Sequence, residues 1–274
     1  MPVRLCALTE KKTSDIFAWI LQHELQNAND ALATQVNGRT YAVASSPLYD
    51  LISGSEIGKF VFTIFSNIKM GRNEILDVDL VLNNTTPTVL AFEKMLPQSS
   101  DSNEYYEVIT QESEQHLIVE TVNRYAVSGN INRTERPVYV SAFPYQLTVF
   151  DSIKAYNKFC GFEKPVQVGN LDLTVHGLGT TFACPGNLPD RNPSNDEPPW
   201  SFMAGEIKSF KKVKIAFGSI LREAYLIILH SALGDLPTLA GTEMFDLNNI
   251  ETGKVVGMNA YIKANFIMDK YPKV

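Results

Sequence analysis

Residues 258–266 read MNAYIKANF, and apolar and polar side chains alternate along the whole stretch. Successive side chains of a β-strand point to opposite faces, so the alternation predicts a strand with one face against a core and the other against water or a polar partner. The core face is expected to carry Met258, Ala260, Ile262, Ala264 and Phe266, and the polar face Asn259, Tyr261, Lys263 and Asn265.

Other segments carry related strand patterns. Lys59–Met70 is apolar on both faces, which predicts a central strand covered on both sides. Pro137–Phe150 also has a strand pattern, but Pro144 has no backbone N–H and must interrupt the ladder there. We therefore expect a mainly β chain, either a β-sandwich or barrel-like antiparallel sheets, that forms a single domain over residues 1–274.

Helices are expected to be few. Apolar residues recur at three- and four-residue steps from Ile16 to Leu32, which predicts one long helix over about residues 14–34. Its apolar stripe would pack on a sheet or dock on a partner. Two further short helices are possible within Ser152–Phe159 and Ser231–Leu239, the second interrupted by a glycine and a proline.

The composition is that of a folded, soluble protein. Of 274 residues, 45% are hydrophobic and 20% charged, and the formal net charge is −6. The negative charge argues against an open nucleic-acid-binding surface. The N-terminal residues do not resemble a signal peptide, and the apolar segments are too short to cross a bilayer. We expect a cytoplasmic protein or a component of an assembled particle, without a membrane partner.

Motifs of catalysis and metal binding are missing from the sequence. Its four histidines form no HExxH, its serines no GxSxG, and its three cysteines no CxxC. Asp77 and Asp79 share one face of a predicted strand and could form a carboxylate pair, although a solvated acidic face is the expected outcome. The sequence thus indicates no enzyme, no cofactor, no metal and no small-molecule ligand. Convergence of both aspartates and a histidine in one pocket would favour an enzyme instead.

A basic segment, KSFKKVK, spans residues 208–214. Its lysines are Lys208, Lys211, Lys212 and Lys214, and Phe210 stands among them. Such a segment could contact phosphates while the aromatic ring stacks on a base. It could equally protect a strand edge from unwanted pairing.

A proline-rich segment covers Cys184–Trp200 and is expected to be a surface loop. Trp200 and Phe202 stand at its end and belong to the residue types that anchor protein interfaces. In the alternative role, both side chains pack into the core and anchor the loop to it.

These features favour a structural or interaction subunit that assembles with copies of itself or joins a larger complex. Viral particles, phage tails and injection devices contain such β-rich subunits, although this is a fold-level analogy. A nucleic-acid-binding subunit that uses the basic segment is the alternative, as is an enzyme whose site is not visible in local sequence. The candidate contact residues are Trp200, Phe202, Lys208, Lys211, Lys212, Lys214, Asn259, Tyr261 and Lys263.

Overall fold

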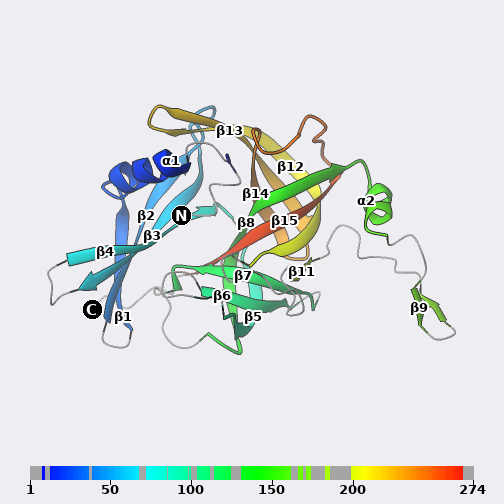
Figure 1. The fold of residues 1–274 in the computed structure, drawn as a ribbon, viewed down its shortest axis with the longest axis horizontal. Coiled ribbons are helices and arrows are strands. Elements are labelled where there is room, and N and C mark those ends of the chain that lie inside the picture. The colour runs from blue at the N-terminus through cyan, green and yellow to red at the C-terminus, as the bar shows by residue number, and fades with distance from the viewer. Residues whose placement is uncertain are drawn as a thin grey trace.

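The structure is a computed structural model, and strands dominate it (Figure 1). It describes residues 8–9, 13–36, 39–67, 72–84, 86–97, 99, 104–111, 114–124, 131–161, 166–168, 171–173, 183–185 and 199–267. The mainly β prediction is confirmed, whereas the sandwich is not. Most of the segment expected as a proline-rich loop, residues 186–198, lies outside the described part of the chain.

The first four strands form an antiparallel sheet in the order of the sequence. They are β1 (Asn29–Val36), β2 (Arg39–Tyr49), β3 (Glu56–Asn67) and β4 (Arg72–Leu82). A separate two-stranded sheet pairs β9 (Val166–Val168) with β10 (Leu171–Leu173).

A nine-stranded sheet has the order β11-β12-β13-β14-β8-β15-β7-β6-β5. Its strands are β5 (Thr88–Met95), β6 (Glu104–Thr110), β7 (His116–Val122), β8 (Thr134–Phe150), β11 (Ala183–Pro185), β12 (Ser201–Phe217), β13 (Ile220–Ser231), β14 (Gly234–Gly241) and β15 (Val255–Phe266). The sheet is mixed rather than purely antiparallel, because β15 runs parallel to β7 and β14 runs parallel to β8.

This sheet closes on itself in two places. In one ring, β12, β13, β14, β8 and β15 pair in turn and β15 pairs again with β12. In the other, β8, β15, β7, β6 and β5 pair in turn and β5 pairs again with β8. β15, red in Figure 1, belongs to both rings and has β8 on one side and β12 followed by β7 on the other.

The main core fills the inside of this sheet. All five apolar residues predicted for the core face of β15 are buried in it, together with side chains from β5 to β8 and β12 to β14. The alternation in residues 258–266 therefore predicted this face correctly, because a period of two places every second side chain on the same side.

A second core lies between the four-stranded sheet and the outer side of the nine-stranded one. Phe60 and Phe62 of β3 are buried there with Val213 and Ile215 of β12. Val61, on the opposite face of β3, packs in a separate valine cluster. The prediction of a doubly covered strand is confirmed for the described part of Lys59–Met70, whereas residues 68–70 lie outside the described residues.

The prediction of one long helix over about residues 14–34 is wrong. The helical segment consists of α1 (Thr13–Trp19) and the π-helical turn η2 (Ile20–Glu24), and β1 begins at Asn29. Ile16 and Ile20 do pack in the second core, so the first half of the apolar stripe has its expected role. The helix ends because the Asn27 side chain donates to the carbonyl of His23 at 3.0 Å, and pairing with β2 then takes the chain into a strand.

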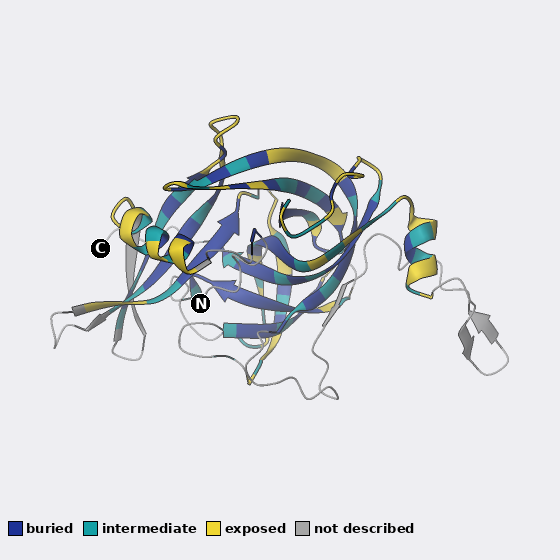
Figure 2. Ribbon diagram, turned by 45° about the horizontal axis from the view of Figure 1, so that its top comes forward, coloured by how far each residue is buried: buried dark blue, intermediate teal, exposed yellow. Residues whose placement is uncertain are grey.

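The two shorter helix predictions differ in outcome. Helix α2 (Ile153–Phe159) is confirmed, and the Ser152 hydroxyl caps it by accepting from the Ala155 N–H at 3.2 Å. The helix expected within Ser231–Leu239 is wrong, because Gly234 adopts a φ of 75° and turns the chain directly from β13 into β14. α1 and α2 lie at opposite ends of the molecule (Figures 1 and 2).

Candidate functional site

The outer face of β15 brings together four of the residues singled out in the sequence. Phe202 of β12 pairs with Asn259, which in turn pairs with Gln146 of β8. The Asn259 side chain donates to the Gln146 side chain at 2.6 Å. Trp200 and Tyr261 stand next along the same face, each about half-buried. Three neighbouring strands therefore present two adjacent rows of partly exposed side chains.

A bulge adds an aromatic ring that the sequence analysis did not identify. The register of β8 shifts between Pro144 and Gln146, which leaves Tyr145 as the additional residue. Its ring centroid lies 5.6 Å from that of Trp200 and 5.5 Å from that of Tyr261. The interruption expected at Pro144 is therefore present, and it places Tyr145 between the other two rings.

Helix α2 borders the same face and forms a small cleft with it. The cleft has a volume of about 120 Å³, and its lining includes Phe150, Phe159, Phe202 and Asn259. Phe159 is 72% exposed, and its ring centroid lies 5.2 Å from that of Phe150. We call the six rings Tyr145, Phe150, Phe159, Trp200, Phe202 and Tyr261 the aromatic face.

Both ends of this face are covered. At one end, Gly257 faces α2, and a Cβ there would lie 3.2 Å from ring atoms of Phe150 and of Tyr156. Tyr156 is fully buried. Burial raises the pKa of the nearby Cys160 thiol, although a hydrogen bond with Tyr156 opposes this shift. The aromatic face therefore ends at helix α2 on this side.

Lys263 covers the other end, and its predicted contact with water or a partner is wrong. Its side chain is fully buried, because β4 of the four-stranded sheet lies over this part of β15. The Lys263 ammonium lies 3.0 Å from Asp79 Oδ1 and also contacts Glu120. Asp79, expected on a solvated face, is buried with it. The period-two pattern identified the face correctly but not what covers it.

The four lysines of the basic segment lie elsewhere on β12, and acidic or hydroxyl groups accompany three of them. Lys208, the bulged residue between Ile207 and Ser209, lies 2.6 Å from Asp235. Lys211 donates to Ser55 at 3.2 Å, and Lys212 lies 2.6 Å from Glu223. The hydrogen bond and the charge of Glu223 raise the pKa of Lys212. For Lys214, it is the backbone N–H that has an acidic partner, because it donates to the carboxylate of Asp50.

The structure does not assemble the histidine-containing pocket that would favour an enzyme. Asp77 and Asp79 gather with Glu120, with carboxylate oxygens within 4.8 Å of one another. His23, His116 and His230 are exposed, and His176 lies outside the described residues. Within the described part of the chain, no histidine therefore joins the acidic cluster.

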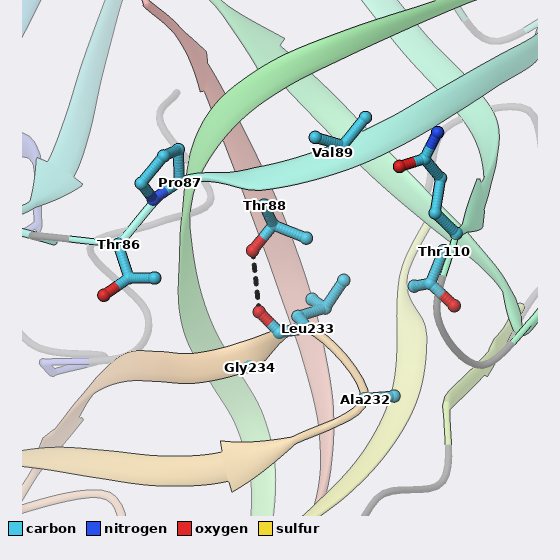
Figure 3. A pocket seen from close by; sticks show the side chains of 9 residues that line it. Thr86, Pro87, Thr88, Val89, Thr110, Ala232, Leu233 and Gly234 are labelled. Atoms are coloured by element: carbon cyan, nitrogen blue, oxygen red, sulfur yellow. Dashed lines mark hydrogen bonds between the residues drawn. The ribbon is translucent and has the colours of Figure 1, made fainter.

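Another hollow, of about 200 Å³, lies between the start of β5 and the β13–β14 turn (Figure 3). Thr88 donates from its hydroxyl to the carbonyl of Leu233 at 2.7 Å across its floor. The described side chains that line it include none that titrates near neutral pH. This hollow offers space but no acid, base or nucleophile of ordinary reactivity.

Comparisons with family models, with curated proteins and with solved structures find no match for this chain. Among the helices that the structure describes, none has the length and apolar character needed to cross a membrane.

Sequence reasoning found Trp200, Phe202, Asn259 and Tyr261, but it missed the aromatic residues that complete the face. Tyr145 could have been noticed, because a proline inside a long strand signals a bulge that re-aims its neighbour. Phe150 and Phe159 carried no such signal, since their approach depends on where α2 folds back.

Proposed function

We propose that this chain is a non-enzymatic structural or interaction subunit that assembles through the aromatic face, with copies of itself or within a larger complex. The supporting observation is the cluster of six neighbouring rings from β8, β12, β15, helix α2 and Trp200 just before β12, in which Phe159 is largely exposed. Aromatic side chains are enriched at the centres of protein interfaces, where they bury a large area at a small cost in side-chain entropy. Phe159, at 72% exposure, is the ring with most to gain from a partner.

The basic segment gives less support to a nucleic-acid partner. Lys208 and Lys212 each form an ion pair with a neighbouring carboxylate, which reduces the positive potential available to phosphates. The two candidate functions also differ in their response to salt. Association of chains with a net charge of −6 through aromatic rings should strengthen with ionic strength, whereas phosphate binding should weaken.

Molar mass measured by light scattering across a concentration series tests self-assembly. We expect a mass above that of the 30.5 kDa monomer, rising with concentration. Phe159→Ser should return the protein to the monomer mass, because it removes the most exposed ring of the face. Phe210→Ser is the matched control: it makes the same change at a 37% exposed ring on another surface and should leave the mass unchanged. A monomer at every concentration would contradict self-assembly.

A further inference from the structure

Lys263 lies at the meeting point of the two large sheets, beside buried carboxyl groups and a cluster of valines. Its side chain has 0% exposure, and those of Asp79 and Glu120 have 4% and 5%. Asp79 belongs to β4 of the four-stranded sheet, whereas Glu120 stands on β7 in register with Lys263. The valine cluster of Val43, Val61, Val81 and Val122 lies along the same strand faces.

The lysine ammonium already supplies the positive charge that these carboxylates require. Asp77, Asp79 and Glu120 have ligand atoms close enough to share a cation, but Lys263 reaches Asp79 at 3.0 Å and contacts Glu120 as well. The arrangement is therefore that of an amine held between carboxyl groups rather than an open metal site. Its chemistry is that of an amine beside a carboxyl group.

Burial favours the neutral forms of such a pair. A proton that moves from the ammonium to the Asp79 carboxylate leaves an amine and a carboxylic acid, and removal from water lowers the preference for the charged forms. An amide goes one step further, because it eliminates both charges permanently and releases one water molecule. In a water-poor site, the equilibrium between the ion pair and the amide moves towards the amide.

The geometry also favours the reaction kinetically. Reacting groups held about 3–3.5 Å apart by a rigid framework react with very high effective concentrations. Lys263 Nζ lies 3.0 Å from Asp79 Oδ1, and the flexible lysine stem allows the nitrogen to move onto the adjacent carbon, Cγ. Asp79 is held on a strand paired in register with β3, so only the lysine has to move.

We propose that Lys263 and Asp79 condense spontaneously to an intramolecular amide that joins the two sheets, with Glu120 as the proton carrier. The Lys263 amine attacks Cγ of the protonated Asp79, and the N–C bond forms. Glu120 accepts a proton from this nitrogen and donates it to the departing hydroxyl, so that the C–O bond breaks and water leaves. One ammonium and one carboxylate become one amide and one water, no electrons are exchanged, and Glu120 ends as it began.

Asp79 rather than Glu120 is the acceptor in this reaction because of the strand arrangement. Glu120 and Lys263 occupy paired positions on neighbouring strands, so their side chains leave the sheet side by side. Asp79 comes from the facing sheet and meets the end of the lysine chain. Glu120 is therefore placed to exchange protons with Lys263 Nζ, and the Asp79 carboxyl group is placed for attack by this nitrogen.

Mass spectrometry of the purified, denatured full chain tests the proposal. We expect an intact mass lower than the sequence mass by one water molecule, and a protease digest in which the peptides containing Lys263 and Asp79 are joined. Lys263→Met and Glu120→Gln should both have their full sequence mass. Lys212→Met, which removes a surface lysine paired with Glu223, is the matched control and should retain the loss of water.

Three results would overturn the proposal. One is a wild-type chain at its full sequence mass, and this measurement needs no variant to fold. Another is a joined peptide that links Lys263 to Glu120 or Asp77 instead of Asp79. A loss of water that persists in Lys263→Met would show a different modification and would equally exclude the amide. Light scattering and mass spectrometry report independently, so failure of self-assembly and failure of the amide are distinguishable.

Discussion

The turn between β2 and β3 depends on one buried carboxylate, and its replacement should weaken the contact between the two large sheets. Asp50 is 1% exposed. Its Oδ1 accepts from the backbone N–H groups of Ile52 and of Lys214, each at 3.0 Å. Its Oδ2 accepts from the N–H and the hydroxyl of Ser53 at 3.3 and 2.6 Å. Because Lys214 belongs to β12, the carboxylate connects this turn to the nine-stranded sheet.

The magnitude follows from what each donor loses. In Asp50→Ala, the Ile52 and Ser53 donors stand on an exposed turn and regain water, so each loss is small. The N–H of Lys214 points from β12 towards this turn and is part-buried, and leaving it without an acceptor costs about 1–3 kcal/mol. We expect Asp50→Ala to lower the free energy of unfolding by about 3 kcal/mol in total. Asp50→Asn keeps the Oδ1 acceptor and should cost about half as much.

The charge of Asp50 adds a pH dependence. Burial alone would raise the pKa of Asp50, but hydrogen bonds from Ser53, Lys214 and Ile52 together lower it below the ordinary value. A carboxyl group whose pKa is lower in the folded protein stabilises the fold above its unfolded pKa, about 4, and this contribution is lost as the pH falls through the folded pKa. The stability difference between wild type and Asp50→Asn should therefore shrink as the pH falls below about 4.

Urea unfolding at a series of pH values measures this difference. Asp246→Asn is the control, since Asp246 Oδ1 accepts an exposed turn hydrogen bond from the backbone N–H of Asn248 at 3.2 Å. It should change the unfolding free energy by less than about 0.5 kcal/mol. A wild-type-to-Asn difference at position 50 that stays constant from neutral pH to below the unfolded pKa would refute the reasoning.

Three further substitutions test other parts of the fold. Gly58→Ala would place a Cβ 2.3 Å from the carbonyl oxygen of Val81 on the paired strand, so the strands must separate. We expect the free energy of unfolding in urea to fall by about 2 kcal/mol or more. An unchanged free energy would contradict this close approach. Ser201→Ala removes a buried hydroxyl that donates to the carbonyl of Ile118 at 3.0 Å and accepts from the Ile118 N–H at 2.7 Å. The free energy of unfolding in urea should fall by about 2–3 kcal/mol. Ser201→Thr should recover part of this loss. Burial raises the pKa of Tyr106 to about 12, so ultraviolet titrations of wild type and Tyr106→Phe should diverge only above about pH 11, and divergence near pH 10 would show an exposed phenol.

The sequence predicted the strands better than their surroundings. Side-chain alternation in residues 258–266 and the two apolar faces of β3 depend on the period of the strand, which is local. The length of the N-terminal helix was wrong, because an apolar stripe can continue past the point where β1 gains hydrogen bonds from β2. Pairing between strands overrides a helical pattern that local sequence alone supports.

The candidate site shows the same limit. Asn259 and Tyr261 were predicted on an accessible face, and they lie on one. Lys263 follows the same pattern two residues later and is buried, because its partner Asp79 stands 184 residues away in the sequence. No periodicity within β15 contains the information that β4 will cover Lys263 at one end of this face.

The central position of β15 also determines when the fold can be completed during synthesis. Every other strand of the two rings precedes residues 255–266 in the chain, yet both rings need β15 between β8 and its other neighbours. An emerging chain can pair β1 to β4 early, but it must keep the edges of β7, β8 and β12 available until the last of these strands leaves the ribosome. Unpaired edges of this kind are sites of aggregation, so this protein should depend on chaperones or on rapid final insertion more than a sequentially paired sheet does.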